Sequence, residues 1–171
     1  GGQEDYNFIQ EQEPLEDDEI EQPTITYSYW KSQDMDAVEY ISGDTYGMYI
    51  SPDGKKLYIA CNGDEIYQFS LSTAWDVTSA SFVRKKTGLL TNAIQGLHFS
   101  GGGTKMFFGS NVGDNANAEQ KVRQYTLSTA WDISTATHDN GVDISSATNN
   151  VHSLRFSQDG DAMFVADNGK N

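Results

Sequence analysis

The histidines, the single cysteine and the carboxylates are the side chains that could do chemistry here, and their spacing matches no catalytic motif. The histidines are His98, His138 and His152, and the cysteine is Cys61. The sequence holds no Gly-x-Ser-x-Gly, no His-Glu-x-x-His and no Cys/His cluster. A nucleophilic cysteine needs an activating base, and none is evident for Cys61. We therefore expect no enzymatic activity, no catalytic residue and no cofactor.

Two kinds of segment could hold a ligand, but neither has the required pattern. Aspartates near turns could supply oxygen ligands to Ca²⁺, yet their spacing is not that of a calcium loop, and Asp-Gly is common in hairpin turns. Residues 100–105, Ser-Gly-Gly-Gly-Thr-Lys, lack the Lys-Ser/Thr ending of a phosphate-binding loop, and no helical pattern follows them. We expect turns at these positions and no metal site.

The charge of the chain argues against two classes of partner. The formal net charge is −14, and nine of the 25 acidic residues lie in residues 1–24, which contain no Lys or Arg. Residues 25–171 carry 16 acidic and 11 basic residues, without a basic stripe. Phosphate groups and anionic lipids are bound by Lys and Arg, so we expect neither a nucleic acid nor a membrane as partner.

An internal repeat organises the sequence. Residues 71–76, Leu-Ser-Thr-Ala-Trp-Asp, recur unchanged as residues 127–132. The match extends to a segment that starts at Gly47, Gly96 and Ser153, with spacings of 49 and 57 residues. A period near 50 residues is typical of β-propeller blades and longer than most solenoid repeats.

Each copy has the pattern of four strands. In the first copy they are predicted at 48–51, 57–61, 66–71 and about 82–86, with a Pro-Asp-Gly turn after the first. The fold class is therefore predicted as all-β, a partial propeller of four-stranded antiparallel blades. The predicted divisions are an acidic arm (1–24), a connecting strand segment (25–45), blade 1 (46–93), blade 2 (94–150) and the start of blade 3 (151–171).

The third copy stops after its second strand. A propeller needs roughly four to eight blades to close, and a single blade cannot bury its own faces. Either the gene product is longer, which we favour, or blades from several chains complete the ring as a homo-oligomer or larger assembly.

The tryptophans of the repeated motif are predicted to pack between blades, because they occupy the same position in both copies. Stacking on sugars is the alternative use of such aromatic side chains. The residues predicted to pack between blades are Trp75, Trp131, Phe69 and Tyr125.

Two further segments are candidates for binding. Residues 1–24 carry apolar side chains spaced along an acidic chain, which predicts an extended arm that anchors to a basic partner; a solvated, disordered tail is the alternative. These side chains are Tyr6, Phe8, Ile9, Leu15 and Ile20. An insertion at 112–121, present in the second copy only, is a candidate recognition loop or a tolerated length variation. Its candidate residues are Asp114, Asn115, Asn117 and Glu119.

The repeat resembles one found in virion proteins of marine bacteriophages, often tail-fibre or appendage proteins. The resemblance is carried by Phe-Ser-x-Asp-Gly-x-x-Met-Phe-Val at 156–165 and by Val-x-Gln-Tyr-x-Leu-Ser-Thr-Ala-Trp-Asp at 122–132. Residues 51–60 are also similar to the YVTN-type surface propellers. The resemblance implies a structural protein of the virion, with residues 1–24 bound to other virion proteins and the propeller displayed toward a host glycan or protein.

Two alternatives remain open. One is a lactonase-type propeller enzyme, which needs carboxylates on the innermost strands; the slot shared by Tyr49, His98 and Arg155 holds none and is predicted to be a variable surface or channel position. The other is a bacterial cell-surface propeller with no connection to phage.

Overall fold

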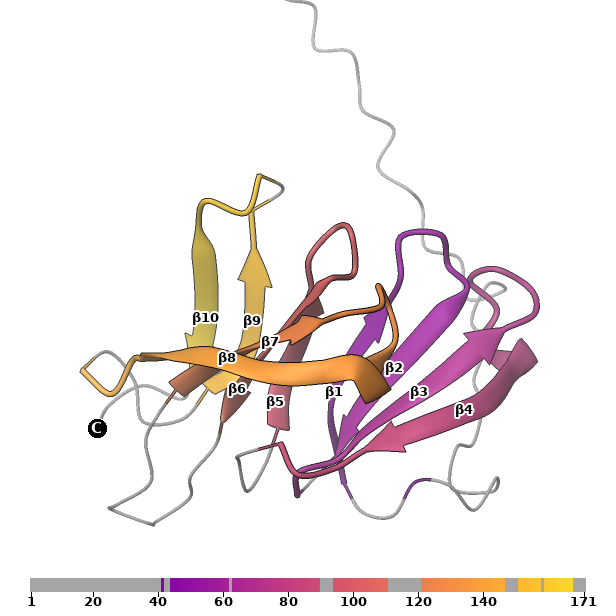
Figure 1. The fold of residues 1–171 in the computed structure, drawn as a ribbon, viewed down its shortest axis with the longest axis horizontal. Coiled ribbons are helices and arrows are strands. Elements are labelled where there is room, and N and C mark those ends of the chain that lie inside the picture. Colours follow the sequence, from indigo (N-terminus) through magenta and orange to yellow (C-terminus); the bar gives the residue numbers. More distant parts are fainter. Residues whose placement is uncertain are drawn as a thin grey trace, which may run out of the picture. The chain divides into compact units, whose positions relative to one another are not determined.

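The protein was analysed as a computed structural model, which describes residue 41 and residues 44–61, 63–89, 94–110, 121–146, 151–157 and 159–167. These residues form three antiparallel sheets, and the two complete ones have four strands each (Figure 1). The first sheet consists of β1 (Thr45–Ile50), β2 (Lys56–Cys61), β3 (Ile66–Leu71) and β4 (Ala80–Lys86). The second consists of β5 (Ile94–Phe99), β6 (Lys105–Ser110), β7 (Lys121–Leu127) and β8 (Ala136–Asp143).

The third sheet contains β9 (Val151–Phe156) and β10 (Met163–Asp167). Within each sheet the strands pair in chain order, so the three sheets follow the three copies of the repeat. The prediction of an all-β fold with four-stranded antiparallel blades is therefore confirmed, and we call the sheets blades 1, 2 and 3. Among the described residues, no helix is long and apolar enough to cross a membrane.

The first hairpin of each blade is closed by a turn that recurs in the three copies. Glycine ends the turn in all three copies with a positive φ, at Gly54 (68°), Gly103 (68°) and Gly160 (80°). In blades 1 and 3 a serine and an aspartate close the turn, where the Ser51 hydroxyl lies 2.5 Å from an Asp53 carboxylate oxygen. Residues 100–105 form the same turn without the aspartate, as the repeat predicts.

Two clusters of buried side chains show how the blades stack. One lies between blades 1 and 2, because it joins Tyr58 and Ala60 of β2 to Phe99, Phe108 and other residues of blade 2. The other covers the opposite face of blade 1 and contains Leu57, Ile59 and Phe69. Strand β2 thus has buried residues on both faces, as its continuous apolar run predicts.

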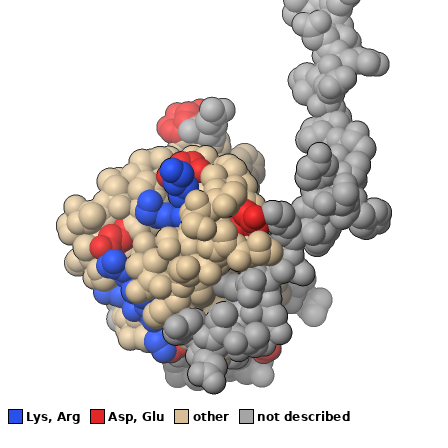
Figure 2. Space-filling view, turned by 90° about the vertical axis from the view of Figure 1, so that its right-hand side faces the viewer, with Lys and Arg blue, Asp and Glu red and all other residues tan. Residues whose placement is uncertain are grey.

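Neighbouring blades are also joined through their first strands, since β5 contacts both β1 and β9. On the face shown in Figure 2, basic and acidic side chains both occur, several of them side by side, amid larger uncharged areas. Within blade 1, the Lys85 ammonium and the Glu65 carboxylate form an ion pair at 2.7 Å.

Candidate functional site: the joint between blades

The repeated Ser-Thr-Ala-Trp-Asp turn has the same backbone in both blades. Each turn leads into a single turn of 3₁₀-helix, η3 (Val77–Ser79) in blade 1 and η4 (Ile133–Thr135) in blade 2. The aspartate before η4, Asp132, accepts a hydrogen bond from the Ser134 N–H, as expected for a residue that caps a helix. The preceding tryptophans have φ values of 65° and 66°, a left-handed conformation that non-glycine residues rarely adopt.

The left-handed backbone brings the Trp131 indole against the first hairpin of its own blade. The backbone N–H of Trp131 donates to the carbonyl oxygen of Gly103 at 2.9 Å, and the indole covers that glycine. The other side of the ring faces aromatic residues, with centroid distances of 6.2 Å to Tyr49 of blade 1 and 5.7 Å to Phe99. The turn of blade 2 therefore packs its indole into the interface with blade 1.

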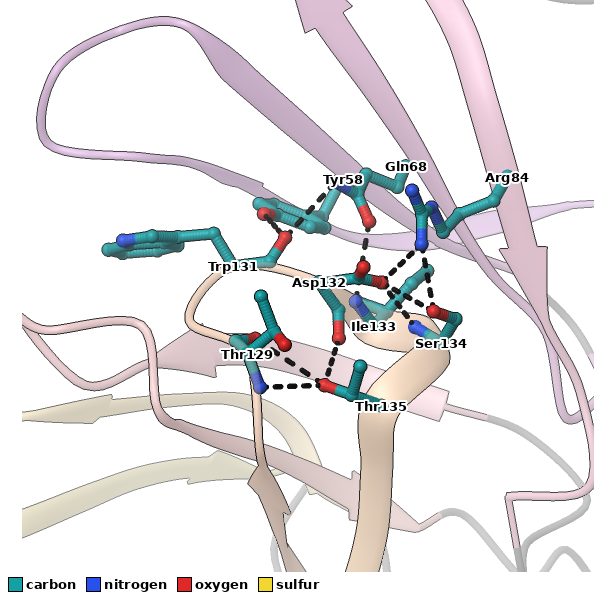
Figure 3. A network of polar contacts seen from close by, with 9 residues as sticks. All are labelled: Tyr58, Gln68, Arg84, Thr129, Trp131, Asp132, Ile133, Ser134 and Thr135. Carbon is teal, nitrogen blue, oxygen red and sulfur yellow. Dashed lines mark hydrogen bonds and ion pairs between the residues drawn. The ribbon is translucent and has the colours of Figure 1, made fainter.

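Polar side chains of blade 1 hold the same turn (Figure 3). The carbonyl oxygen of Trp131 accepts hydrogen bonds from the Tyr58 hydroxyl at 2.7 Å and from the Gln68 amide at 3.0 Å. The oxygen of the Gln68 amide accepts from the Ile133 N–H at 3.3 Å. Gln68 is only 5% exposed, so one buried amide satisfies a carbonyl and an N–H of the neighbouring blade. Burial raises the pKa of Tyr58, which keeps its hydroxyl a donor.

A partly exposed ion pair lies at the outer end of the joint. The Arg84 guanidinium on β4 bonds to the Asp132 carboxylate and, at 2.8 Å, to the Ser134 hydroxyl. Hydrogen bonds from Ser134 and the charge of Arg84 together hold the pKa of Asp132 below its ordinary value. The tryptophan, Gln68 and this pair form one continuous site, which we call the joint.

Replacing Gln68 with alanine is expected to lower the free energy of unfolding by about 2 kcal/mol, because the buried Ile133 N–H loses its partner. Urea unfolding of the purified chain measures the change. Gln124 is the matched control, since it occupies the same position in blade 2 and bonds to the exposed Asp139 instead. Gln124→Ala is expected to cost less than about 0.5 kcal/mol, and equal losses in the two variants would contradict the role given to Gln68.

The joint is also expected to make stability depend on pH. A carboxyl whose pKa is lower in the folded chain stabilises it above the unfolded pKa of about 3.9, and this contribution is lost as the pH falls through the folded value. The Asp132→Asn variant lacks this carboxyl. Its urea midpoint of unfolding should therefore fall less between pH 7 and pH 3 than the midpoint of the unaltered chain. Parallel urea titrations at the two pH values measure this difference. An equal change of midpoint in the two chains would contradict the prediction.

The structure places the four residues predicted to pack between blades in different environments. Trp131 lies in the joint, and Tyr125 is buried in the cluster between blades 1 and 2. Phe69 is buried on the opposite face of blade 1. Trp75 differs from the expectation, because it is 60% exposed although its backbone and its position over Gly54 copy those of Trp131. The difference arises because Trp75 lies on the face of blade 1 that is turned away from blade 2.

The binding segments predicted from the sequence lie outside the described residues. This holds for the arm at 1–24, with Tyr6, Phe8, Ile9, Leu15 and Ile20, and for the loop residues Asp114, Asn115, Asn117 and Glu119. Both assignments therefore stay predictions.

Gln68, like Tyr58 and Arg84, is a residue of the joint that the sequence prediction missed. The alternating pattern of 66–71 places Gln68 on the polar side of its strand, which suggests solvent exposure. The available signal was the repeat itself, because Gln68 and Gln124 are identical at corresponding positions. A polar residue that recurs in both copies on an inner strand points to a specific hydrogen bond, which Gln68 makes to blade 2 and Gln124 makes to Asp139 of its own blade.

The slot shared by Tyr49, His98 and Arg155 is half-buried at its first two positions and exposed at Arg155. The Tyr49 ring lies edge-on to His98 at 5.5 Å, and His98 lies 5.4 Å from the ring of Phe156. The prediction named a variable surface or channel position, and the His98 side chain is half-buried between rings of the two neighbouring blades. Burial, together with the nearby Arg155, lowers the pKa of His98, which favours the neutral imidazole. Its Nδ1 atom is buried and has no hydrogen-bond partner among the described residues.

Carboxylates are not gathered around this slot in the way that a metal ion requires. In the described ranges, no group of three or more His, Cys, Asp or Glu side chains is placed to hold a metal. Asp53 and Asp159, two of the aspartates in turns, accept hydrogen bonds within those turns.

Comparison with known proteins supports the fold and leaves the family open. No family model matches the sequence, and no curated protein matches it either. A candidate 6-phosphogluconolactonase from Bacteroides uniformis aligns with a TM-score of 0.55 and 13% identity, over 74% of this chain and 34% of its own length. Another from Bacteroides fragilis aligns with a TM-score of 0.52 and 12% identity, over 70% and 30%.

The chain thus spans about a third of the length of either neighbour. Both neighbours are named after an enzymatic activity, which is said of those proteins. At this level of identity, however, the likeness establishes the fold alone, which is a partial, propeller-like stack of antiparallel four-stranded sheets.

Proposed function

We propose that the chain is a structural and binding protein of a bacteriophage particle, in which stacked blades form a stiff platform for attachment to a host glycan or protein. The proposal of a stiff platform rests on the joint, where one buried amide and one tyrosine hydroxyl hold the turn of the neighbouring blade. Such a joint favours a rigid scaffold, on which loops can present binding groups. The assignment to a virion rests on the resemblance of the repeat and on the acidic arm.

Two variants of the full chain test this proposal. Deletion of residues 1–24 is expected to remove the chain from purified particles in a density gradient, because the arm anchors it. Replacement of residues 112–121 by the shorter Gly-Asp-Glu segment of the first copy is the matched control. That control should remain in the particle and lose attachment to host cells. Normal incorporation of the arm deletion would refute the anchor, and normal attachment of the loop variant would refute the recognition role of the insertion.

A lactonase-type enzyme is the second candidate, favoured by the names of the two structural neighbours. Its chemistry would involve the neutral imidazole of His98, which could act as a general base for water near the positive charge of Arg155. The full chain would then hydrolyse 6-phosphogluconolactone faster than buffer does, followed as release of acid. His98→Ala should abolish the excess rate, whereas Trp75→Ala should leave it unchanged. A rate equal to that of buffer would exclude this candidate.

A further inference from the structure

A titratable ring lies where the first strands of blades 2 and 3 meet. His98 occupies the position in β5 that Tyr49 occupies in β1. Its imidazole lies 5.4 Å from the Phe156 ring of blade 3 and 5.5 Å from the Tyr49 ring of blade 1. Its Nδ1 atom is buried and has no hydrogen-bond partner in the described part of the chain. Blade 3 therefore packs against a side chain that can gain a charge near neutral pH.

The corresponding contact between blades 1 and 2 is made by a group that keeps its charge state over the same range. There the Tyr49 ring lies 5.2 Å from the Phe99 ring of blade 2, and the Tyr49 hydroxyl donates to the Phe99 carbonyl oxygen at 3.4 Å. Burial raises the pKa of Tyr49 above its ordinary value of about 10. The phenol is therefore neutral in both neutral and mildly acidic solution, and this contact does not change between them.

A positive charge on His98 would be poorly accommodated. Arg155 occupies the third copy of the same position, and its guanidinium donates to the carbonyl oxygens of Leu154 at 3.2 Å and Leu97 at 3.5 Å. Leu97 precedes His98 in β5, so a permanent positive charge lies beside the imidazole. Burial takes water away from the charged form of the imidazole, and the charge of Arg155 repels that form. Both effects lower the pKa of His98, and burial is the larger of the two.

The other groups that face the imidazole do not offset this charge. Asp159, in the turn between β9 and β10, lines the same cavity of about 370 Å³ as His98. Its carboxylate accepts hydrogen bonds within its own turn, from the Ser157 hydroxyl at 2.5 Å and the Asp161 N–H at 3.1 Å. Strand β6 contributes the uncharged ring of Phe107. The ion pairs found among the described residues join other side chains.

We infer that His98 is a pH-sensitive contact: protonation of its imidazole in mildly acidic solution loosens blade 3 from blade 2, while the joint keeps blades 1 and 2 together. The unfolded chain, in which the pKa of the imidazole is about 6.5, binds this proton more readily than the folded chain does. The contact therefore has its full strength above that pH and weakens as the pH falls below it. This inference goes beyond the proposed function, because it concerns the contact between two blades in whichever role the chain has.

Hydrogen exchange of the full 171-residue chain, followed by mass spectrometry at pH 7.5 and pH 5.5, tests the inference. Protection factors, corrected for the intrinsic exchange rate at each pH, should fall at least about twofold in β9 and β10 at the lower pH. They should stay equal in β1–β4. Carboxyl groups, whose ordinary pKa is about 4, keep their charge over this range. Equal protection of β9 and β10 at the two pH values would overturn the inference.

Two variants of His98 identify the sensor. His98→Tyr introduces the residue that blade 1 has at this position, and it should abolish the effect of pH on β9 and β10. His98→Gln, a smaller neutral side chain, should do the same. His138→Gln is the matched control, because His138 also lies edge-on to a tyrosine ring, that of Tyr125 at 5.2 Å, but is exposed and within its own blade. That control should keep the effect. Persistence of the effect in either His98 variant, or its loss in His138→Gln, would refute the role given to His98.

Discussion

Trp131→Ala is expected to lower the free energy of unfolding by about 3 kcal/mol, whereas Trp75→Ala should cost less than about 1 kcal/mol. The Trp131 indole packs between two aromatic rings and Gly103 in the joint, and its removal leaves a hollow between blades 1 and 2. The Trp75 ring covers Gly54 and is 60% exposed.

The pair is well matched because the two tryptophans share their local sequence and their backbone, with φ values of 65° and 66°. Alanine retains the Cβ atom, so the left-handed strain is the same before and after either substitution. Any difference between the variants therefore reports packing against the neighbouring blade. Urea unfolding, followed by far-UV circular dichroism, measures both free energies, and similar losses would show that the joint contributes little.

Gly96→Ala is expected to lower the free energy of unfolding by about 3 kcal/mol, through left-handed strain and overpacking together. Gly96 has φ +60°, and a Cβ atom there would lie 2.7 Å from the Leu154 nitrogen and from the Ser153 Cα. These are backbone atoms, which cannot rotate away as a side chain does. Strands β5 and β9 would have to separate, and blade 3 would lose part of its contact with blade 2.

Gly160→Ala serves as the control for Gly96→Ala, because it introduces a Cβ atom at a positive φ of 80° where no atom lies within 4 Å. Only the strain remains there, with an expected cost of about 1 kcal/mol. Hydrogen exchange followed by mass spectrometry should show faster exchange of β9 and β10 in Gly96→Ala, with β1–β4 unchanged. If both glycine variants lost the same stability, close approach of the strands would not be the cause.

The strands and turns could be predicted from the sequence because their causes are local. The Asp-Gly turns and the apolar runs place the predicted strands 57–61 and 66–71 within one residue of β2 and β3. The fourth strand was predicted less sharply, since the short 3₁₀ turn η3 precedes it and has no clear pattern of its own.

The joint could be predicted only in part, because it depends on what lies beside each blade. Trp75 and Trp131 have identical neighbours in sequence, and the six-residue motif cannot tell which of them meets another blade. The alternating pattern of β3 likewise places Gln68 on the polar side of the strand. It does not show that this side faces the backbone of the next blade. Repeat alignment identifies the equivalent positions, but the contacts follow from the stacking of the blades.

The joint has a consequence for how such a chain could change over time. All of its parts, from the glycine under the indole to the tyrosine and glutamine on the next face, are encoded inside one copy of about 50 residues or inside the copy that precedes it. Unequal recombination that gains or loses a whole copy would therefore bring together two ends that already fit. Gene duplication could alter the number of copies without any compensating point mutation, and the protein could vary in size while each contact stayed the same.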